Sequence, residues 1–357
     1  MATEQIKPRI IAFEVTRRCR YYCRHCRAGA GPDFAERELS TEQCKKILDS
    51  VASFCIGPKK PRRRVYKGQP IIILTGGEPM ERADIYELVE HGRKLGLRMV
   101  MATCGYLLDA DSIKKLKKSG IAALSFSLDG ASAETHDEFR ETRGAFDAVI
   151  SAARLAREAE IPFQINTTIS KLNIAEAFGI ADLARHIGAY CFNPFLLVPT
   201  GRGEELDDLV LDPIEYEVFL NELLGFKLTS DIQIRITCAP QAARIAAQSS
   251  AEKRASDING CMGGRGFGFI SYKGDVQTCG FLQVSAGNLI KKRYNFGRIW
   301  EKSKLLEEVR DISHYTGKCR QCEYVGLCGG CRARAFATSG DYLGTDPVCP
   351  YKPGEKS

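Results

Sequence analysis

Three cysteines near the N-terminus have the residue type and the spacing of metal ligands. Cys19, Cys23 and Cys26 form a C-x3-C-x2-C pattern in the segment TRRCRYYCRHCRA. Thiolates hold iron–sulfur clusters, and a four-iron cluster is saturated by four of them, so a local set of three leaves one iron free for another ligand. A zinc site completed by His25 is the alternative, although His25 abuts Cys26 more closely than zinc ligands are usually spaced.

A second group of cysteines lies towards the C-terminus, in a segment that is also rich in glycine. Its members are Cys261, Cys279, Cys319, Cys322, Cys328, Cys331 and Cys349. These thiols outnumber the four of a zinc ribbon, which is the alternative here. The first ten residues contain no apolar signal core, so we expect a cytoplasmic protein. In that reducing compartment, dense cysteine indicates metal ligation or catalysis rather than disulfides.

A glycine-rich segment follows the second apolar run of the chain. Gly76, Gly77, Glu78 and Pro79 come directly after residues 71–74. Glycines at the end of a strand allow the backbone to approach a ligand closely, and a carboxylate can accept hydrogen bonds from an ammonium group. Taken alone, the segment is equally typical of a simple turn.

The elements that must position these residues alternate in type along the chain. Short apolar runs predict strands at residues 10–15, 71–74, 97–102, 123–128, 163–169 and 191–198, and amphipathic segments predict helices at 40–53, 82–95, 109–118, 145–158 and 174–187. Repeated βαβ units form a parallel sheet with right-handed crossovers. Because there are fewer units than the eight of a closed barrel, we expect an α/β fold with a partial (β/α)6 barrel.

Polar residues gather where the predicted strands end, which is the edge at which ligands bind in open α/β folds. Ser127 and Asp129 belong to the fourth strand end, Asn166 lies in the fifth strand, and Arg140 follows the fourth. We expect the barrel to cover residues 9–212, a helical bridge 213–259, and a small cysteine-rich domain 260–353. Residues 57–70 read as a basic loop that includes Arg62, Arg63 and Arg64.

Composition excludes several classes of function. No apolar run reaches the 18 residues of a membrane span. The formal net charge of +7 suits an anionic ligand. Because the positive charges are dispersed and are not interleaved with aromatic residues, we expect no nucleic-acid partner.

The cysteine motif after the first strand, together with Gly76-Gly77-Glu78-Pro79 after the second, resembles the radical S-adenosylmethionine (SAM) superfamily. The resemblance implies that SAM chelates the open iron of a 4Fe–4S cluster and that an electron from a donor such as ferredoxin or flavodoxin releases a 5′-deoxyadenosyl radical. It also implies a set of SAM-binding residues: Gly76, Gly77, Glu78, Pro79, Ser127, Asp129, Arg140, Asn166 and His25.

The C-terminal cysteines are similar to the SPASM extension of that superfamily, which carries auxiliary four-iron clusters. The resemblance implies one cluster on Cys319, Cys322, Cys328 and Cys349, and an inner cluster on Cys261, Cys279 and Cys331. Some relatives have a further inner ligand at the position of Ala255. The inner cluster could therefore be open, take Cys238, or be absent.

Further segments resemble one branch of the superfamily, the anaerobic haem b synthases. They are VPTGRG at 198–203, CGFL at 279–282 and GGCRARA at 329–335. This resemblance implies oxidative decarboxylation of two propionates of iron-coproporphyrin III to the vinyl groups of haem b. Arginines that could bind the substrate carboxylates are Arg62, Arg63, Arg64, Arg202, Arg265 and Arg298. The alternatives are a 12,18-didecarboxysirohaem deacetylase, a relative from haem d1 biosynthesis, a SPASM peptide-modifying maturase, and a zinc-ribbon binding protein.

Overall fold

A computed structural model describes residues 6–57, 68–249 and 258–354. Its centre is one open sheet of ten strands in the order β10-β9-β8-β1-β2-β3-β4-β5-β6-β7. The parallel strands of the barrel are β1 (Ile10–Thr16), β2 (Ile71–Gly76), β3 (Arg98–Thr103), β4 (Ala123–Ser127), β5 (Phe163–Ile169) and β6 (Cys191–Leu196). Arg62, Arg63, Arg64 and Ala255 lie outside the described residues.

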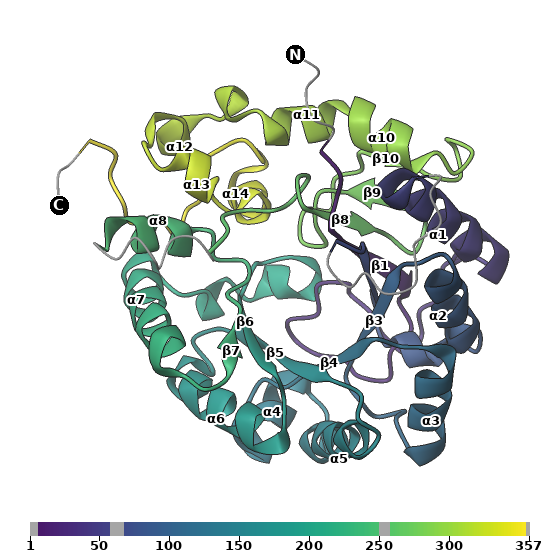
Figure 1. Ribbon diagram of the computed structural model, residues 1–357. Coiled ribbons are helices and arrows are strands. Elements are labelled where there is room, and N and C mark those ends of the chain that lie inside the picture. The colour runs from purple at the N-terminus through teal and green to yellow at the C-terminus, as the bar shows by residue number, and fades with distance from the viewer. Residues whose placement is uncertain (1–5, 58–67, 250–257, 355–357) are drawn as a thin grey trace.

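Helices cover the outer face of the curved sheet (Figure 1). They are α1 (Thr41–Ile56), α2 (Ile85–Lys94), α3 (Ala110–Ser119), α4 (Ala133–Arg140), α5 (Ala145–Glu158) and α6 (Ala177–Ile187). The sheet does not close on itself, since β10 and β7 remain its two edges. The expected α/β class and partial barrel are therefore confirmed.

The alternation of side chains along the strands explains how the sheet and the helices pack. On β1, Ile11, Phe13 and Val15 are buried in the same core as Ile47 and Leu48 of α1. A capping box opens α1: Ser40 Oγ accepts from Gln43 N at 3.3 Å, and Gln43 Oε1 accepts from Ser40 N at 2.9 Å.

The segment after the barrel adds strands to both edges of its sheet. It contains α7 (Pro213–Thr229), β7 (Gln233–Ile234), α8 (Gln241–Gln248), β8 (Phe267–Ile270), β9 (Asp275–Gln277) and β10 (Gly287–Asn288). β7 pairs in parallel with β6, and β8 in parallel with β1. The first strands of the cysteine-rich range thus extend the barrel sheet. The division of the chain at 212 and 259 stays a prediction.

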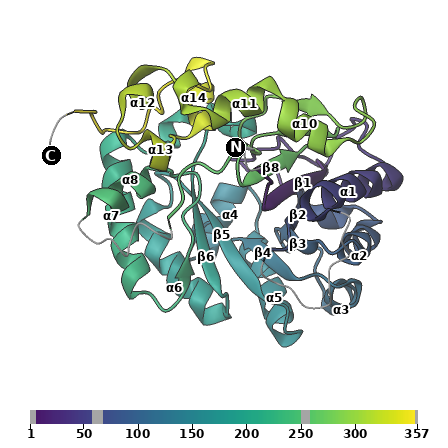
Figure 2. The ribbon, with the colours of Figure 1, turned by 45° about the horizontal axis from the view of Figure 1, so that its top comes forward.

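Short helices fill the remaining gap between the two sides of the barrel (Figures 1 and 2). They are α10 (Phe296–Lys302), α11 (Lys304–Arg310), α12 (Gly317–Gln321), α13 (Val325–Cys328) and α14 (Arg332–Ser339). In the part of the chain that the structure describes, no helix combines the length and the apolar character that a membrane crossing requires.

Candidate active site and cluster-binding cysteines

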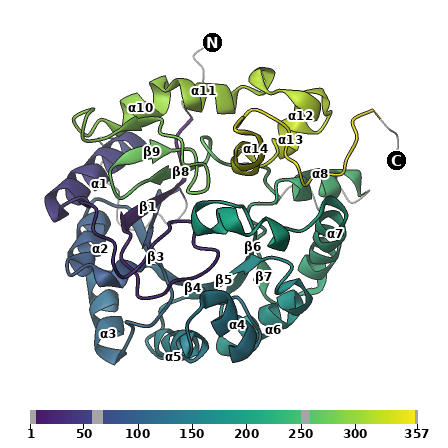
Figure 3. The same ribbon diagram turned by 180° about the vertical axis from the view of Figure 1, so that it is seen from behind.

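The loop that follows β1 carries the N-terminal cysteine motif across the carboxyl ends of the parallel strands (Figure 3). Cys19 and Cys23 are buried in one small apolar cluster with Cys104, and Cys26 packs against it. The loop is closed by hydrogen bonds from Cys19 N to the Gly31 carbonyl at 3.2 Å and from Cys26 N to the Cys23 carbonyl at 3.2 Å. The structure therefore brings the three thiols together.

Gly201 and Arg202, which follow β6, hold this loop from the opposite side of the barrel. A Cβ atom on Gly201 would lie 2.3 Å from the Arg27 carbonyl oxygen, so only glycine allows the approach. Arg202 Nε donates to the Cys23 carbonyl at 3.0 Å, and Nη1 donates to the Ala30 carbonyl at 2.7 Å. The cysteine loop occupies these two donors of Arg202, and binding of a substrate carboxylate by Arg202 stays a prediction.

The Gly76–Pro79 segment lies against the same loop. A Cβ atom would lie 2.1 Å from the Thr16 carbonyl oxygen at Gly76, and 2.4 Å from the Arg18 carbonyl oxygen at Gly77. Gly77 N and Glu78 N donate to these two carbonyls at 2.8 and 2.9 Å. The glycines therefore let two strand-end segments meet backbone to backbone.

Glu78 is fully buried, and its carboxylate accepts hydrogen bonds from the end of β3. Thr103 Oγ1 donates to both oxygens at 2.9 and 2.8 Å, and Cys104 N donates to Oε2 at 2.8 Å. Burial raises the pKa of Glu78 above its ordinary value. Because donors of the chain occupy these oxygens, an ammonium group of SAM would have to share them.

Asp129, Arg140 and His25 form a buried group beside Cys23. Arg140 Nη2 lies 2.6 Å from Asp129 Oδ2, and its Nη1 lies 3.8 Å from Cys23 Sγ. Thr168 N donates to the other Asp129 oxygen at 2.7 Å. His25 Nε2 lies 3.5 Å from Asp129, and burial lowers the pKa of His25 to about 4, so its ring is neutral at pH 7.

These contacts limit what Asp129 and Arg140 can offer a ligand. The Arg140 charge lowers the pKa of the Asp129 carboxyl against the opposing effect of burial. Both side chains are therefore charged and paired with each other. We infer that they orient the cysteine loop and place one cation near its thiols, while His25 Nδ1 is buried without a hydrogen-bond partner among the described residues.

Ser127 and Asn166 belong to the face of β4 and β5 that is turned away from the buried helix layer. Along β5 the half-buried residues Gln164, Asn166 and Thr168 alternate with buried ones. Asn166 Oδ1 accepts from Gln164 Nε2 at 2.8 Å and from Asn193 Nδ2 at 3.3 Å. A row of polar groups thus lines the interior of the barrel, and contact of Asn166 and Ser127 with SAM stays a prediction.

The sequence interpretation missed the partners that β3 supplies. Thr103 and Cys104 bind Glu78, and Tyr106 OH lies 4.0 Å from Cys19 Sγ and accepts from Arg20 N at 2.9 Å. A hydrogen bond with Cys104 lowers the pKa of the Cys19 thiol below its ordinary value. The position of Thr103 and Cys104 at the end of a parallel strand was the available signal.

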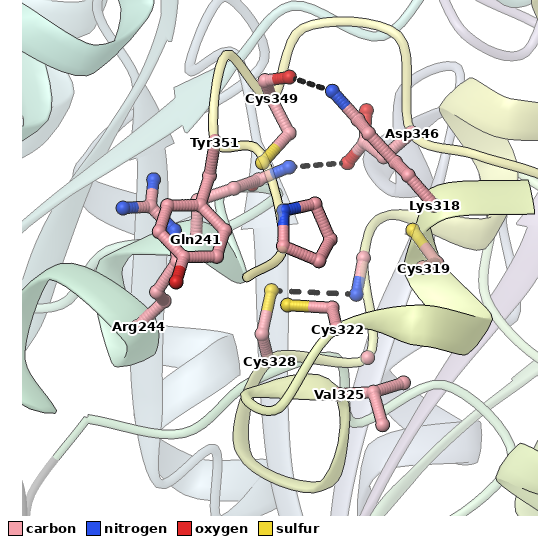
Figure 4. A pocket seen from close by; sticks show the side chains of 13 residues that line it. Gln241, Arg244, Lys318, Cys319, Cys322, Val325, Cys328, Asp346, Cys349 and Tyr351 are labelled. Atoms are coloured by element: carbon pink, nitrogen blue, oxygen red, sulfur yellow. Dashed lines mark hydrogen bonds between the residues drawn. The ribbon is translucent and has the colours of Figure 1, made fainter. Parts of the chain in front are cut away.

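The four cysteines that the resemblance assigns to one auxiliary cluster line a single hollow (Figure 4). They are Cys319, Cys322, Cys328 and Cys349. No three of the described Cys, His, Asp or Glu side chains converge as they stand on the position of one ion.

Cations surround this hollow. Arg244 and Lys318 line it, and Arg332 Nη2 lies 3.6 Å from Cys319 Sγ. A thiolate-ligated cluster carries net negative charge, which nearby cations and hydrogen-bond donors stabilise. The donor set and its surroundings therefore fit a four-iron cluster.

The three cysteines expected to hold the inner cluster lie next to the outer group. Cys261 N donates to the Cys328 carbonyl at 2.9 Å, and Cys331 N donates to Asp346 Oδ2 at 2.7 Å. Arg265 Nη1 and Nη2 donate to the carbonyls of Cys261 and Arg310 at 3.4 and 3.1 Å. Backbone carbonyls thus occupy two donors of Arg265. Arg298 is exposed. Binding of a propionate by either arginine stays a prediction.

The segment after Cys279 connects the inner group to the N-terminal loop. Arg27 Nη1 donates to the Gly280 carbonyl at 3.3 Å, and Gln283 Nε2 donates to the Arg27 carbonyl at 3.0 Å. Thr200 Oγ1 donates to the Phe281 carbonyl at 3.2 Å. Two cysteine groups far apart in the sequence are thus joined by direct hydrogen bonds.

Comparisons with known proteins identify the family of this chain. The chain matches the family model of the radical SAM superfamily over residues 13–184 and that of SPASM, an iron–sulfur cluster-binding domain, over residues 261–323. It is also 42% identical, over 98% of its own length and 98% of the relative's, to an AdoMet-dependent heme synthase of Methanosarcina barkeri. The chain therefore belongs to the radical SAM superfamily, is an enzyme, and has SAM and iron–sulfur clusters as cofactors.

A second relative and one solved structure are also similar to the chain. It is 31% identical, over 96% of its length and 88% of the relative's, to an Fe-coproporphyrin III synthase of Methanosarcina barkeri. The solved structure of Streptococcus suis SuiB bound to S-adenosylmethionine superposes with a TM-score of 0.74 at 17% identity, over 97% of this chain and 78% of that one. The similarity to SuiB supports the fold alone.

All fifteen cysteines belong to the described residues, and each is a free thiol. The alternative of a disulfide framework is therefore wrong. The zinc-ribbon binding protein is also set aside, because the family is that of an iron–sulfur enzyme.

Proposed function

We propose that this chain converts iron-coproporphyrin III to haem b by oxidative decarboxylation of two propionates to vinyl groups. The observation that carries the proposal is the 42% identity, over nearly the full length of both chains, to a relative named AdoMet-dependent heme synthase. The relative named Fe-coproporphyrin III synthase is 31% identical, which favours the first activity over the second.

The balance of the reaction explains why cysteine groups are needed at two places. When bound to the open cluster, SAM supplies a radical able to remove a hydrogen atom from an unactivated carbon. At each propionate that atom leaves the carbon next to the ring, carbon dioxide departs, and two of the three remaining electrons form the vinyl π bond. The third electron must go to an acceptor. An auxiliary cluster is suited to take it, since cluster potentials are tuned over about a volt by charge, hydrogen bonding and exposure.

The roles of the chain's own residues follow from their contacts. Cys19, Cys23 and Cys26 would hold the SAM-binding cluster, and Arg140, Asp129 and Arg202 fix their loop. The outer cysteines would hold an auxiliary cluster among Arg244, Lys318 and Arg332.

We further propose a cytoplasmic site of action and a low-potential donor such as ferredoxin or flavodoxin. The free cysteines suit a reducing compartment. The SAM-binding cluster requires one external electron for each propionate.

The mass of the tetrapyrrole product tests the proposal. The protein is reconstituted with iron and sulfide without oxygen and given iron-coproporphyrin III, SAM and a reductant. Loss of the mass of two formic acids supports haem b formation. Conversion of 12,18-didecarboxysirohaem with loss of two acetate side chains, and no reaction of iron-coproporphyrin III, would instead assign the chain to the deacetylases.

A further inference from the structure

Cys238 lies where the barrel sheet meets the inner cysteine group. The preceding residue, Thr237, continues the edge of the sheet: its amide donates to the Pro194 carbonyl at 3.0 Å, and its carbonyl accepts from Leu196 N at 3.2 Å. The chain leaves the carboxyl edge of the barrel directly after this pairing. Cys238 thus follows directly on the barrel sheet, whereas Cys261, Cys279 and Cys331 belong to the C-terminal segment.

The backbone of Cys238 is held in an unusual conformation. Its φ angle is +59°, in the left-handed region that few residues other than glycine and asparagine adopt. The Cys238 carbonyl accepts from Arg334 Nη2 at 2.8 Å and from Tyr216 OH at 3.5 Å. Such conformations cost energy and persist at sites where the surroundings impose them. The backbone conformation at Cys238 is therefore imposed by its surroundings.

The neighbours of Cys238 include two of the three expected inner ligands. Cys238 and Cys279 pack against one small cluster that contains Cys331 and Val198. The Cys261 segment reaches the same region, because Gly264 N donates to the carbonyl of Thr278, the residue before Cys279, at 3.2 Å. Cysteines from two parts of the chain thus lie in one region of the fold.

A buried cation accompanies this group. Arg334 is 1% exposed, and its Nη1 lies 3.2 Å from Asp346 Oδ2. Its Nε atom is buried without a hydrogen-bond partner among the described residues. The Asp346 carboxylate also accepts from Cys331 N at 2.7 Å. A charged network next to several thiols is what a ligated cluster requires from its surroundings.

We propose that Cys238 is the fourth thiolate ligand of the inner auxiliary cluster, together with Cys261, Cys279 and Cys331. This inference rests on the iron–sulfur part of the proposed function and deepens it. With four thiolates, every iron of the inner cluster is bound by the protein. The inner cluster then carries electrons, and it offers no iron to a substrate carboxylate or to the tetrapyrrole.

The test uses cyanide labelled with ¹³C, which binds an iron that lacks a protein ligand. The full chain carries Cys19→Ala, Cys23→Ala and Cys26→Ala, so that the SAM-binding cluster contributes no open iron. Clusters are reconstituted and reduced, and hyperfine coupling to ¹³C is measured with Cys238 intact, with Cys238→Ala, and with Cys55→Ala. Cys55 is a matched control, because it is a partly buried thiol on α1 whose Sγ lies 3.8 Å from the Pro8 carbonyl oxygen, away from the C-terminal cysteines.

We expect no ¹³C coupling with Cys238 intact or with Cys55→Ala, and clear coupling with Cys238→Ala. Coupling with Cys238 intact would overturn the proposal, because an inner iron would already be open. Absence of coupling in all three proteins, with equal iron contents, would overturn it too.

Should Cys238→Ala fail to fold, Cys238→Ser in the otherwise unaltered chain is expected to change the Mössbauer parameters of one iron site, and an unchanged spectrum would contradict the proposal. None of these readouts needs tetrapyrrole turnover, so failure of the haem b assignment is measured separately.

Discussion

Arg140 Nε donates a hydrogen bond to Asp129 Oδ2 at 2.8 Å, and its Nη2 lies 2.6 Å from the same oxygen. Both residues are almost completely removed from solvent. Because Arg140 also lies 3.8 Å from Cys23 Sγ, the ion pair connects the cysteine loop to the ends of β4 and β5.

Asp129→Asn should destabilise the protein by roughly 3–5 kcal/mol, since it leaves the Arg140 charge buried without its partner. Urea denaturation of the metal-free chain measures this loss, and iron content after reconstitution should fall with it. Asp231→Asn removes an exposed carboxylate and serves as the control. Equal unfolding free energies for the two variants would refute the role of the pair.

Cys23→Ala should abolish the cleavage of SAM and lower the iron content by about one four-iron cluster, since thiolates are the protein ligands of such clusters. Cys322→Ala should lose a similar amount of iron but still cleave SAM in the uncoupled reaction, while haem formation stops. Both are measured as 5′-deoxyadenosine and haem released per chain. Continued release of 5′-deoxyadenosine by Cys23→Ala would remove the N-terminal motif from the site.

Gly77→Ala should weaken SAM binding and lower stability, because the new Cβ would lie 2.4 Å from the Arg18 carbonyl oxygen and force the two strand ends apart. Gly225→Ala is the matched control, as nothing lies within 4 Å of its added Cβ and alanine favours the helix by up to about 1 kcal/mol. Thermal unfolding and equilibrium dialysis with SAM compare the two. A Gly77→Ala protein that behaves like Gly225→Ala would contradict the close approach.

His136 should make the protein less stable as the pH falls. Its Nδ1 accepts from Asp129 N at 2.9 Å, and burial lowers its pKa from 6.5 to about 4. Between these two pKa values, the unfolded chain is protonated at His136 and the folded chain is not. The contribution of the neutral His136 ring to the free energy of unfolding is fully present above pH 6.5, and about 2 kcal/mol of it is lost by pH 5.

His136→Asn keeps an acceptor at the same place and should remove this share of the pH dependence. Denaturation midpoints at pH 7 and pH 5 measure it. His314→Asn, which replaces an exposed histidine, should retain the wild-type difference. A His136→Asn protein with the wild-type difference would show that this ring does not cause it.

The strands of the barrel could be predicted from sequence because each is a short apolar run between amphipathic helices. Helix α4 was missed, since AETHDEFR is short and polar and buries only His136, Phe139 and Arg140. The pairing of β8 with β1 was missed as well, because it joins residues more than two hundred positions apart.

The same limit applies to the site. The spacing of the cysteines predicted which thiols act together, since ligands on one loop are close in sequence. The partners of Glu78 and the role of Arg202 depend on contacts between different strand ends. Spacing along the chain does not predict such contacts. Cys238 could be left only as an alternative for the same reason.

Transfer of deuterium from the substrate tests the central claim most directly. Iron-coproporphyrin III labelled with deuterium at the propionate carbons next to the ring is incubated with the reconstituted protein, SAM and a reductant, and the 5′-deoxyadenosine is analysed by mass spectrometry. The account predicts one deuterium in the 5′-deoxyadenosine formed for each vinyl group produced. Vinyl formation with unlabelled 5′-deoxyadenosine, or without any, would contradict it.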